Sequence, residues 1–414
     1  MILVKADWLI TQDPNRRIIK NGAVLIEREQ IADIGKVPKL EKKYAKAKIK
    51  IINGKGKVVI PGLINSHTHA AMTLLRGYAD DLPLNEWLTQ KIWPAETKFT
   101  AADIFCGTKL ACEEMLASGT TAFNNMYYHP EQEIKAARQN GIRDFVGLVA
   151  IQTGSQKCGP AYIESEYRKL KNLVSEKIKL VLAPHAIYTV PKETLIWCKK
   201  FADKNGLLLH IHLSETEGEI KNCLKQNKCR PAEHLEKIGF LGKNVLVAHG
   251  CWLSETEIRI LAKRGVSIAH CPTSNLKLAS GVMPLSKLLK AGVNVCLGTD
   301  GASSNNSLDM FSEMKTAALI HKWNERNPSA APAQTIFDLV TLNGAKALGR
   351  QNELGSLEIG KKADIAILNF NQPHLKPCFN PISHLIYAAC GRDVEMVLVG
   401  GKIMHQANLK FAYC

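Results

Sequence analysis

The sequence predicts an α/β fold, a (β/α)8 TIM-type barrel with a small β-sandwich domain formed by the N- and C-terminal segments. Three observations predict it. Short apolar strands alternate with amphipathic helical stretches in the middle of the chain, which is the rhythm of a (β/α)8 barrel. Both ends of the chain instead carry β-like runs separated by turn residues. The length of 414 residues suits one large barrel and one smaller domain.

The two ends of the chain have the same β-like character. Apolar runs cover residues 2–4, 23–27, 31–34 and 49–52 near the N-terminus, and residues 363–368 and 394–402 near the C-terminus. Turn residues such as Gly35 and Gly400-Gly401 interrupt them. Neither end holds enough strands for a stable sheet of its own. We therefore expect residues 1–58 plus 359–414 to form one composite domain, and residues 59–358 to form the barrel.

The central region supplies the eight barrel strands. We expect them at residues 58–64, 121–123, 144–150, 179–183, 207–213, 245–248, 266–269 and 293–297. Helical stretches separate them, for example residues 101–118 and 191–204. In such barrels the chemistry takes place at the carboxyl ends of the strands. Polar residues that directly follow a strand are therefore the candidates for function.

The composition excludes several classes of protein. Apolar residues make up 46% of the chain and charged residues 22%, as in an ordinary globular protein. No stretch approaches the ~18 uninterrupted apolar residues that a membrane span requires. Residues 1–30 lack the apolar core of a signal peptide. We expect a cytoplasmic protein without a membrane partner, in which most of the twelve cysteines are reduced and buried.

The net charge of +16 raises the possibility of nucleic-acid binding. Part of this charge lies in residues 36–57, which hold nine lysines and a single aromatic residue, Tyr44. Base-stacking aromatics and a nucleic-acid-binding motif are missing from this segment. We therefore expect a solvated lysine-rich face and no specific nucleic-acid partner.

Histidines and carboxylates stand at the ends of the expected strands. His67 and His69 follow residues 57–66, which read as a buried strand, and residues two apart in a strand project to the same side. His212 lies at the end of the strand at 207–213 and Glu215 three residues further on, His249 follows 245–248, and Asp300 follows 293–297. Three imidazoles and one carboxylate form a sound ligand shell for zinc.

His210 shares its strand face with His212 but lies deeper in the expected barrel. We interpret it as a core histidine whose hydrogen bonds are satisfied.

The order of these motifs resembles the amidohydrolase superfamily. The resemblance is carried by PGLINSHTH at 61–69, HLSET at 212–216, His249-Gly250 and GTDG at 298–301. Within that superfamily, LPLNEWL at 82–88, IWPAE at 92–96 and SNLKLASG at 274–281 resemble the 5′-methylthioadenosine/S-adenosylhomocysteine deaminases. The resemblance runs nearly end to end. It implies a zinc-dependent hydrolytic deaminase of 5′-modified adenosines, which releases the inosine analogue and ammonia.

The resemblance also implies a role for each site residue. The residues that would bind one divalent metal, Zn²⁺, are His67, His69, His212 and Asp300. Glu215 would carry a proton from the attacking water to the ring nitrogen beside the carbon under attack. His249 would orient and polarise that water, and Asp300 would help move the remaining proton to the departing ammonia. All of these transfers belong to general acid–base catalysis.

The substrate contacts are implied in the same way. Glu96 matches a glutamate that binds the ribose 2′- and 3′-hydroxyls, and His185 matches a histidine that contacts the substrate. Glu215 and Asp300 also face the substrate, and Trp87 and Trp93 are interpreted as part of the wall beside it. Proteins of this kind form homo-oligomers, which we expect here as well.

The chain departs from the family pattern after the third expected strand. Residues 152–160 read QTGSQKCGP and lack an arginine that contacts the substrate in many members. Lys157 could replace it only as a point charge, without the bidentate fork of arginine. If that arginine holds the carboxylate of a homocysteine tail, 5′-methylthioadenosine and 5′-deoxyadenosine are favoured over S-adenosylhomocysteine. A smaller departure is Ile187, where proline is common.

Two alternatives stay open. The same metal chemistry could act on another ring, of the guanine, pterin or triazine type, and Glu96 discriminates because a ribose-binding carboxylate has no purpose with a free base. A non-catalytic amidohydrolase-like scaffold is the other alternative. Metal analysis of the purified protein distinguishes that scaffold from an enzyme.

Overall fold

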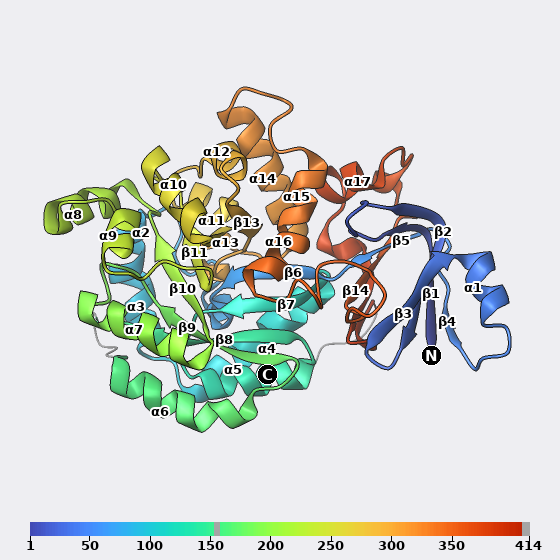
Figure 1. The fold of residues 1–414 in the computed structure, drawn as a ribbon, viewed down its shortest axis with the longest axis horizontal. Helices are drawn as coiled ribbons and strands as arrows, with labels where there is room; N and C mark the ends of the chain where they lie inside the picture. Colours follow the sequence, from blue (N-terminus) through green and yellow to red (C-terminus); the bar gives the residue numbers. More distant parts are fainter. Residues whose placement is uncertain (153–157, 408–414) are drawn as a thin grey trace.

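The computed structural model describes residues 1–152 and 158–407 and contains two sheets. One is an eight-stranded parallel sheet surrounded by helices, and the other is a mixed sheet beside it (Figure 1). The mixed sheet unites the beginning and the end of the chain, so that blue and red ribbon lie together in Figure 1. The predicted fold class, a barrel with a separate sheet from both chain ends, is confirmed.

The parallel sheet follows the order of the chain. Its strands are β6 (Leu63–Thr68), β7 (Thr120–Asn125), β8 (Arg143–Ala150), β9 (Ile178–Pro184), β10 (Leu208–Leu213), β11 (Val245–His249), β12 (Ser267–His270) and β13 (Asn294–Leu297). After β13 the chain returns to the first strand, where the amide of Asp300 donates to the carbonyl of His67 at 3.0 Å. The barrel is therefore nearly closed, and the carboxyl ends of its strands meet at one mouth.

Helices cover the outside of the barrel and extend its mouth. The outer helices are α4 (Ala101–Ala117), α5 (Pro130–Asn140), α6 (Pro160–Leu170), α7 (Lys192–Asn205), α8 (Glu217–Asn227), α9 (Pro231–Lys237), α10 (Glu255–Arg264), α11 (Pro272–Lys277), α12 (Leu285–Lys290), α13 (Ala302–Asn305), α14 (Met310–Asn324), α15 (Ala333–Leu339) and α16 (Leu342–Ala347). A series of short helical turns follows β6: η1 (Ala70–Leu75), α2 (Leu84–Glu86), η2 (Trp87–Ile92) and α3 (Trp93–Glu96). The two helices predicted at 101–118 and 191–204 correspond to α4 and α7.

Local sequence explains where α4 begins. Thr100 is its N-cap and accepts a hydrogen bond from the amide of Asp103, whose carboxylate accepts one from the amide of Thr100. This capping box satisfies amide groups that the first turn of a helix leaves without partners.

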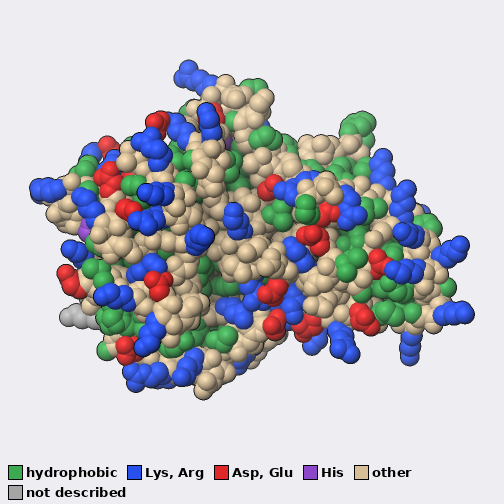
Figure 2. Space-filling view, viewed as in Figure 1, with side chains coloured by type: hydrophobic (Ala, Val, Ile, Leu, Met, Phe, Trp, Pro, Cys, Tyr) green, Lys and Arg blue, Asp and Glu red, His purple; other side chains and the backbone are tan. Residues whose placement is uncertain are grey.

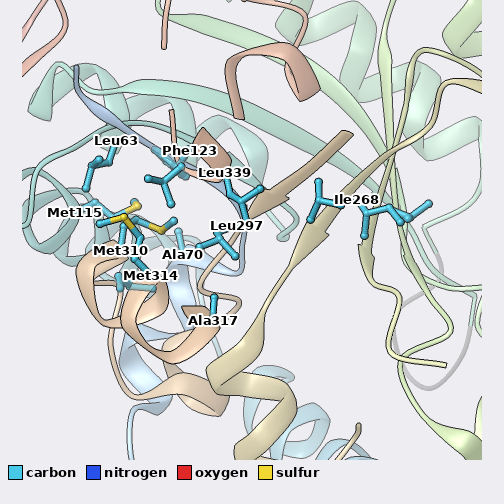
Figure 3. Close-up of a cluster of buried hydrophobic side chains, with 14 of the residues drawn as sticks. Leu63, Ala70, Met115, Phe123, Ile268, Leu297, Met310, Met314, Ala317 and Leu339 are labelled. Atoms are coloured by element: carbon cyan, nitrogen blue, oxygen red, sulfur yellow. The ribbon is translucent and has the colours of Figure 1, made fainter. Parts of the chain in front are cut away.

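Buried apolar side chains fix the helices to the barrel. Figure 3 shows Met115 of α4 beside Met310 and Met314 of α14, near Phe123 of β7. These side chains are fully buried in one large cluster that also includes Leu297 of β13. Because close-packed interiors resist deformation, the cluster holds the strands rigidly, and with them the residues at their ends.

The mixed sheet has the order β16-β15-β14-β5-β1-β2-β3, with β4 paired to β1. Its strands are β1 (Ile2–Ile10), β2 (Ile18–Glu27), β3 (Gln30–Lys36), β4 (Lys50–Ile52), β5 (Lys57–Pro61), β14 (Ile365–Asn369), β15 (Val394–Val399) and β16 (Lys402–Gln406). The remaining elements are α1 (Val37–Lys43), α17 (Pro381–Tyr387), η3 (Lys171–Leu173), η4 (Pro373–Leu375) and η5 (Gly391–Asp393). The predicted turn at Gly400-Gly401 joins β15 to β16. The division at residues 58 and 359 stays a prediction.

The first predicted barrel strand, residues 58–64, was wrong as a single element. Gly62 divides it: β5 pairs with β1 and β14 in the mixed sheet, whereas β6 enters the barrel. The chain crosses between the sheets where a Cβ on Gly62 would lie 2.2 Å from the side chain of Thr121. Only glycine fits this close approach. His67 consequently lies within β6, near its end, and His69 follows it.

The lysine-rich segment lies on the surface of the mixed sheet. Its lysines are exposed or, for Lys57, half-buried, and Figure 2 shows Lys and Arg side chains scattered over this part of the molecule. Most of the cysteines within the described ranges are buried. Within residues 1–152 and 158–407, none of the helices has the length and apolar character needed to cross a membrane.

Candidate active site

Four of the predicted residues converge at the mouth of the barrel. Asp300 Oδ1 lies 3.4 Å from His67 Nε2 and 3.3 Å from His69 Nε2. His212 Nε2 lies 3.3 Å from His69 Nε2. The strands that carry these residues are the first, fifth and eighth of the barrel, so residues far apart in sequence supply one compact group.

These separations fit a zinc ion. In a tetrahedron with metal–ligand bonds of ~2.0–2.1 Å the ligand atoms are about 3.3–3.4 Å apart. His67 Nε2 is buried and has no hydrogen-bond partner among the described residues. The Nε2 atoms of His69 and His212 face each other at a distance where two lone pairs repel. A cation bound between these atoms would remove the repulsion between His69 and His212 and would give His67 Nε2 the partner that it lacks.

The backbone sets the tautomers of two of these imidazoles. His69 Nδ1–H donates to the carbonyl of Met126 at 2.7 Å, and His212 Nδ1–H donates to the carbonyl of His185 at 2.6 Å. A carbonyl can only accept, so the proton lies on Nδ1 and the lone pair lies on Nε2. Burial lowers the pKa of His69 to about 4, which keeps its imidazole neutral. Neutral imidazoles with this orientation are the form that binds metal ions.

Asp300 is held in one orientation by its neighbours. Its Oδ2 accepts hydrogen bonds from Ser274 Oγ at 2.6 Å and Ser304 Oγ at 3.3 Å, and its Oδ1 accepts one from the amide of Gly301 at 2.8 Å. Although burial opposes ionisation, the close approach of His67 and the other nearby imidazoles hold the pKa of Asp300 well below its usual range. Its φ of +63° is strained for a non-glycine residue, a feature that clusters at functional sites.

Glu215 and His249 lie beside this group. Glu215 Oε2 is 3.7 Å from His249 Nε2, and Glu215 Oε1 accepts a hydrogen bond from Ser280 Oγ at 3.2 Å. Burial, with the charge of Asp300 as a second cause, raises the pKa of Glu215 to about 8. A carboxyl group with a raised pKa can both take and release a proton near neutral pH.

Two neighbouring residues position this pair. The carboxylate of Glu219 accepts hydrogen bonds from the amides of Ser214 and Glu215, each at 2.9 Å, and so fixes the turn after β10. Asn275 Nδ2 lies 3.0 Å from His249 Nδ1. In this amide orientation His249 Nδ1 accepts, so its proton lies on Nε2 and faces Glu215. His249 therefore presents a donor where His69 and His212 present lone pairs.

A pocket opens above these groups. Its floor includes His69, His212, Glu215, His249 and Asp300, and its walls are mainly apolar and aromatic. The wall residues are Met72, Leu84, Trp87, Leu88, Trp93, Glu96, Met126, Tyr127, Tyr128, Val149, His185, Tyr188 and Leu278. Trp87 and Trp93 therefore lie where the sequence analysis expected them. A mainly apolar pocket with a few polar groups is typical of a small-molecule site.

Glu96 is the carboxylate on the wall of this pocket. It ends the short helix α3, is buried, and accepts a hydrogen bond from Tyr127 Oη at 2.6 Å. Burial raises the pKa of Glu96 to about 7, and the hydrogen bond from Tyr127 limits that rise. Tyr127 uses one acceptor position, so the carboxylate keeps further lone pairs for a ligand in the pocket.

His185 also lines the pocket. Its Nδ1 lies 2.8 Å from Thr189 Oγ1, and its backbone carbonyl is the acceptor that orients His212. Burial lowers the pKa of His185 to about 3, so its ring is neutral. The residue thus contributes a side chain to the pocket and a backbone acceptor to His212.

Sequence reasoning missed several residues of the site. Tyr127 and Tyr128 follow β7, and that position at a strand end was the signal that could have identified them. Glu219 and Asn275 gave no such signal, because their roles depend on contacts across different elements.

Part of the loop that departs from the family pattern, residues 152–160, lies outside the described residues. This part is residues 153–157 and includes Lys157. Among the residues that the structure describes, those lining the pocket include no lysine or arginine. The described lining of the pocket therefore offers no lysine or arginine to pair with a carboxylate of a substrate.

Comparisons with known proteins agree with this geometry. The profile of the amidohydrolase family matches residues 58–404. A 5′-deoxyadenosine deaminase of Methanosarcina acetivorans is 45% identical over 97% of this chain and 92% of its own length. A 5-methylthioadenosine/S-adenosylhomocysteine deaminase of Thermodesulfovibrio yellowstonii is 43% identical over 96% of this chain and 92% of its own length. The crystal structure of a Xanthomonas campestris adenosine deaminase with bound zinc superposes with a TM-score of 0.93, at 34% identity, and covers 99% of this chain and 94% of that one.

Proposed function

The chain belongs to the amidohydrolase family, and on this basis we propose that it is a zinc-dependent hydrolase that deaminates 5′-modified adenosines to the inosine analogue and ammonia. One observation carries the proposal: a group formed by His69, His212, Asp300 and Glu215 lines the same pocket as the buried carboxylate of Glu96. The group can hydrolyse a C–N bond, and the carboxylate of Glu96 can bind a ribose. The similar deaminases of adenosine nucleosides support this reading.

His67, His69, His212 and Asp300 would hold the zinc ion. Bound in such a donor set, zinc lowers the pKa of water toward ~7 and supplies hydroxide at neutral pH. Glu215 takes a proton from the attacking water and delivers it to the ring nitrogen beside the carbon under attack. The N–H of His249 orients the water, and the carboxylate of Asp300 receives its remaining proton and passes it to the departing amino group, which leaves as ammonia.

The walls of the pocket position the nucleoside. The free lone pairs of Glu96 accept hydrogen bonds from the ribose 2′- and 3′-hydroxyls, and His185 contacts the substrate. The apolar walls exclude water and suit a neutral 5′ group. Assembly as a homo-oligomer and a cytoplasmic location stay predictions.

A panel of nucleosides tests the proposal. We expect kcat/KM to be higher for 5′-methylthioadenosine and 5′-deoxyadenosine than for S-adenosylhomocysteine, because the described pocket offers no cation to a homocysteine carboxylate. Adenosine serves as the reference, and ammonia release is the measurement. Turnover of guanine, a pterin or a triazine in place of all four nucleosides would overturn the proposed substrate class.

Removal of the carboxylate of Glu96 tests the ribose contact. We expect Glu96→Ala to lower kcat/KM for 5′-methylthioadenosine roughly 10- to 150-fold, since a hydrogen bond to a charged group contributes about 1.5–3 kcal/mol. A 2′,3′-dideoxy analogue should show little further loss in this variant. Exposed Glu86, which does not line the pocket, provides the control variant Glu86→Ala. A Glu96→Ala enzyme that still prefers the analogue with hydroxyls as strongly as the wild type would contradict the contact.

A further inference from the structure

His210 lies directly behind one of the metal ligands. It belongs to β10, is fully buried, and its Nε2 is 2.7 Å from His67 Nδ1. Its other ring nitrogen, Nδ1, is 3.2 Å from the carbonyl oxygen of Leu246 on the neighbouring strand β11. The sequence analysis expected a core histidine with satisfied hydrogen bonds. The structure adds that one of these hydrogen bonds reaches a residue of the proposed zinc site.

The carbonyl of Leu246 decides where the protons lie in this chain of contacts. A carbonyl only accepts, so His210 Nδ1 must carry a proton and donate it. A second proton on the ring would place an unpaired charge in the barrel interior, which is costly. Nε2 of His210 therefore holds a lone pair and accepts from His67 Nδ1–H. His67 in turn keeps its lone pair on Nε2, the atom that lies 3.4 Å from Asp300 Oδ1.

The three imidazoles proposed to bind zinc, those of His67, His69 and His212, thus reach the same tautomer by two routes. His69 and His212 donate directly to the carbonyls of Met126 and His185. His67 reaches a carbonyl only through the ring of His210. This difference makes His67 the ligand whose tautomer depends on another side chain.

We propose that His210 is a positioning residue that fixes the tautomer and ring orientation of His67, so that His67 Nε2 faces the metal site with its lone pair. The inference rests on the zinc site of the proposed function. Without an acceptor beside Nδ1, the proton of His67 has no partner there and can move to Nε2, where it blocks coordination. Groups that orient metal ligands in this way typically contribute 10- to 100-fold to metal affinity or activity.

Zinc affinity of the full-length protein provides the test, measured by competition with a chelator. We expect His210→Phe, which keeps a ring but cannot accept a hydrogen bond, to bind Zn²⁺ about 10- to 100-fold more weakly than the wild type. His210→Gln can accept from His67 and donate to Leu246, so it should remain within a few-fold of the wild type. His321→Phe is the matched control, because it removes another contact between buried histidines, to His270 at 3.0 Å, that touches no proposed ligand.

Nitrogen-15 NMR of the histidine rings tests the tautomers without any variant. In the zinc-free wild type we expect both His67 and His210 as the Nδ1–H form. An Nε2–H form of His67, or a His210→Phe protein that is folded and binds Zn²⁺ as tightly as the wild type, would overturn the inference. Failure of the proposed function looks different, since the wild type would then bind zinc with the expected tautomers and deaminate no nucleoside.

Discussion

Glu215→Gln is expected to lower kcat for 5′-methylthioadenosine by about 10²- to 10⁴-fold, the range that a positioned general acid–base group contributes. Glutamine preserves the shape of the side chain and can still accept the hydrogen bond from Ser280. It cannot take a proton from water and pass it to the ring. The loss should therefore appear in kcat, while KM changes little, because the interaction is made mainly in the transition state.

The structure separates this effect from damage to the metal site. Glu215 is not among the four residues proposed to hold zinc, so the variant should bind Zn²⁺ as the wild type does. Glu217, exposed on α8 and two residues further along the chain, provides the matched control Glu217→Gln, for which we expect unchanged kcat. If Glu215→Gln kept kcat within tenfold of the wild type at full zinc content, another group would have to carry the proton.

The residues that sequence analysis placed together are those whose position at a strand end dictates convergence. His67, His69, His212 and Asp300 each lie at or just after the end of a barrel strand, and a barrel brings all such positions to one mouth. No contact had to be known to group them. The alternation of strands and helices was likewise enough for the fold class, because a parallel strand needs a helical crossover to reach the next one.

Features that depend on contacts between elements were not predictable. Residues 58–64 form an apolar run interrupted by the breaker pair Pro61-Gly62, and this pair alone does not reveal that β5 and β6 belong to different sheets. The chain crosses between the sheets where Gly62 closely approaches Thr121. The partnership of His210 with His67 is hidden for the same reason, since 143 positions separate the two residues. Burial made His210 look inert, whereas its hydrogen-bond partners give it a role.

A second contact of this kind joins the barrel to the mixed sheet. Arg143, at the start of β8, donates from Nε to Asp364 Oδ2 at 2.6 Å and from Nη2 to Oδ1 at 2.9 Å. Asp364 precedes β14, and its carboxylate also accepts from the amide of Gly400 at 2.8 Å. The side chains are only 2% and 5% exposed. The carboxylate of Asp364 therefore connects three segments, through an ion pair to Arg143 and a hydrogen bond from Gly400.

Asp364→Ala is expected to reduce the free energy of unfolding by about 3–5 kcal/mol, because it removes the hydrogen-bonded counter-charge of the buried guanidinium of Arg143. The measurement is urea unfolding followed by circular dichroism. Glu164→Ala removes an exposed ion pair with Arg168, whose side chains are 41% and 73% exposed, and should cost less than about 1 kcal/mol. This contrast isolates burial as the cause of the larger loss.

The double variant Arg143→Met with Asp364→Leu decides whether the loss comes from the missing attraction or from the stranded charge. If the stranded charge dominates, replacing both partners by apolar side chains removes the penalty, and the double variant unfolds at a higher urea concentration than Asp364→Ala. Losses that simply add across the two sites would contradict this explanation. Because Arg143 begins β8 while the proposed zinc ligands lie at the opposite ends of their strands, the folded double variant should bind Zn²⁺ with unchanged affinity.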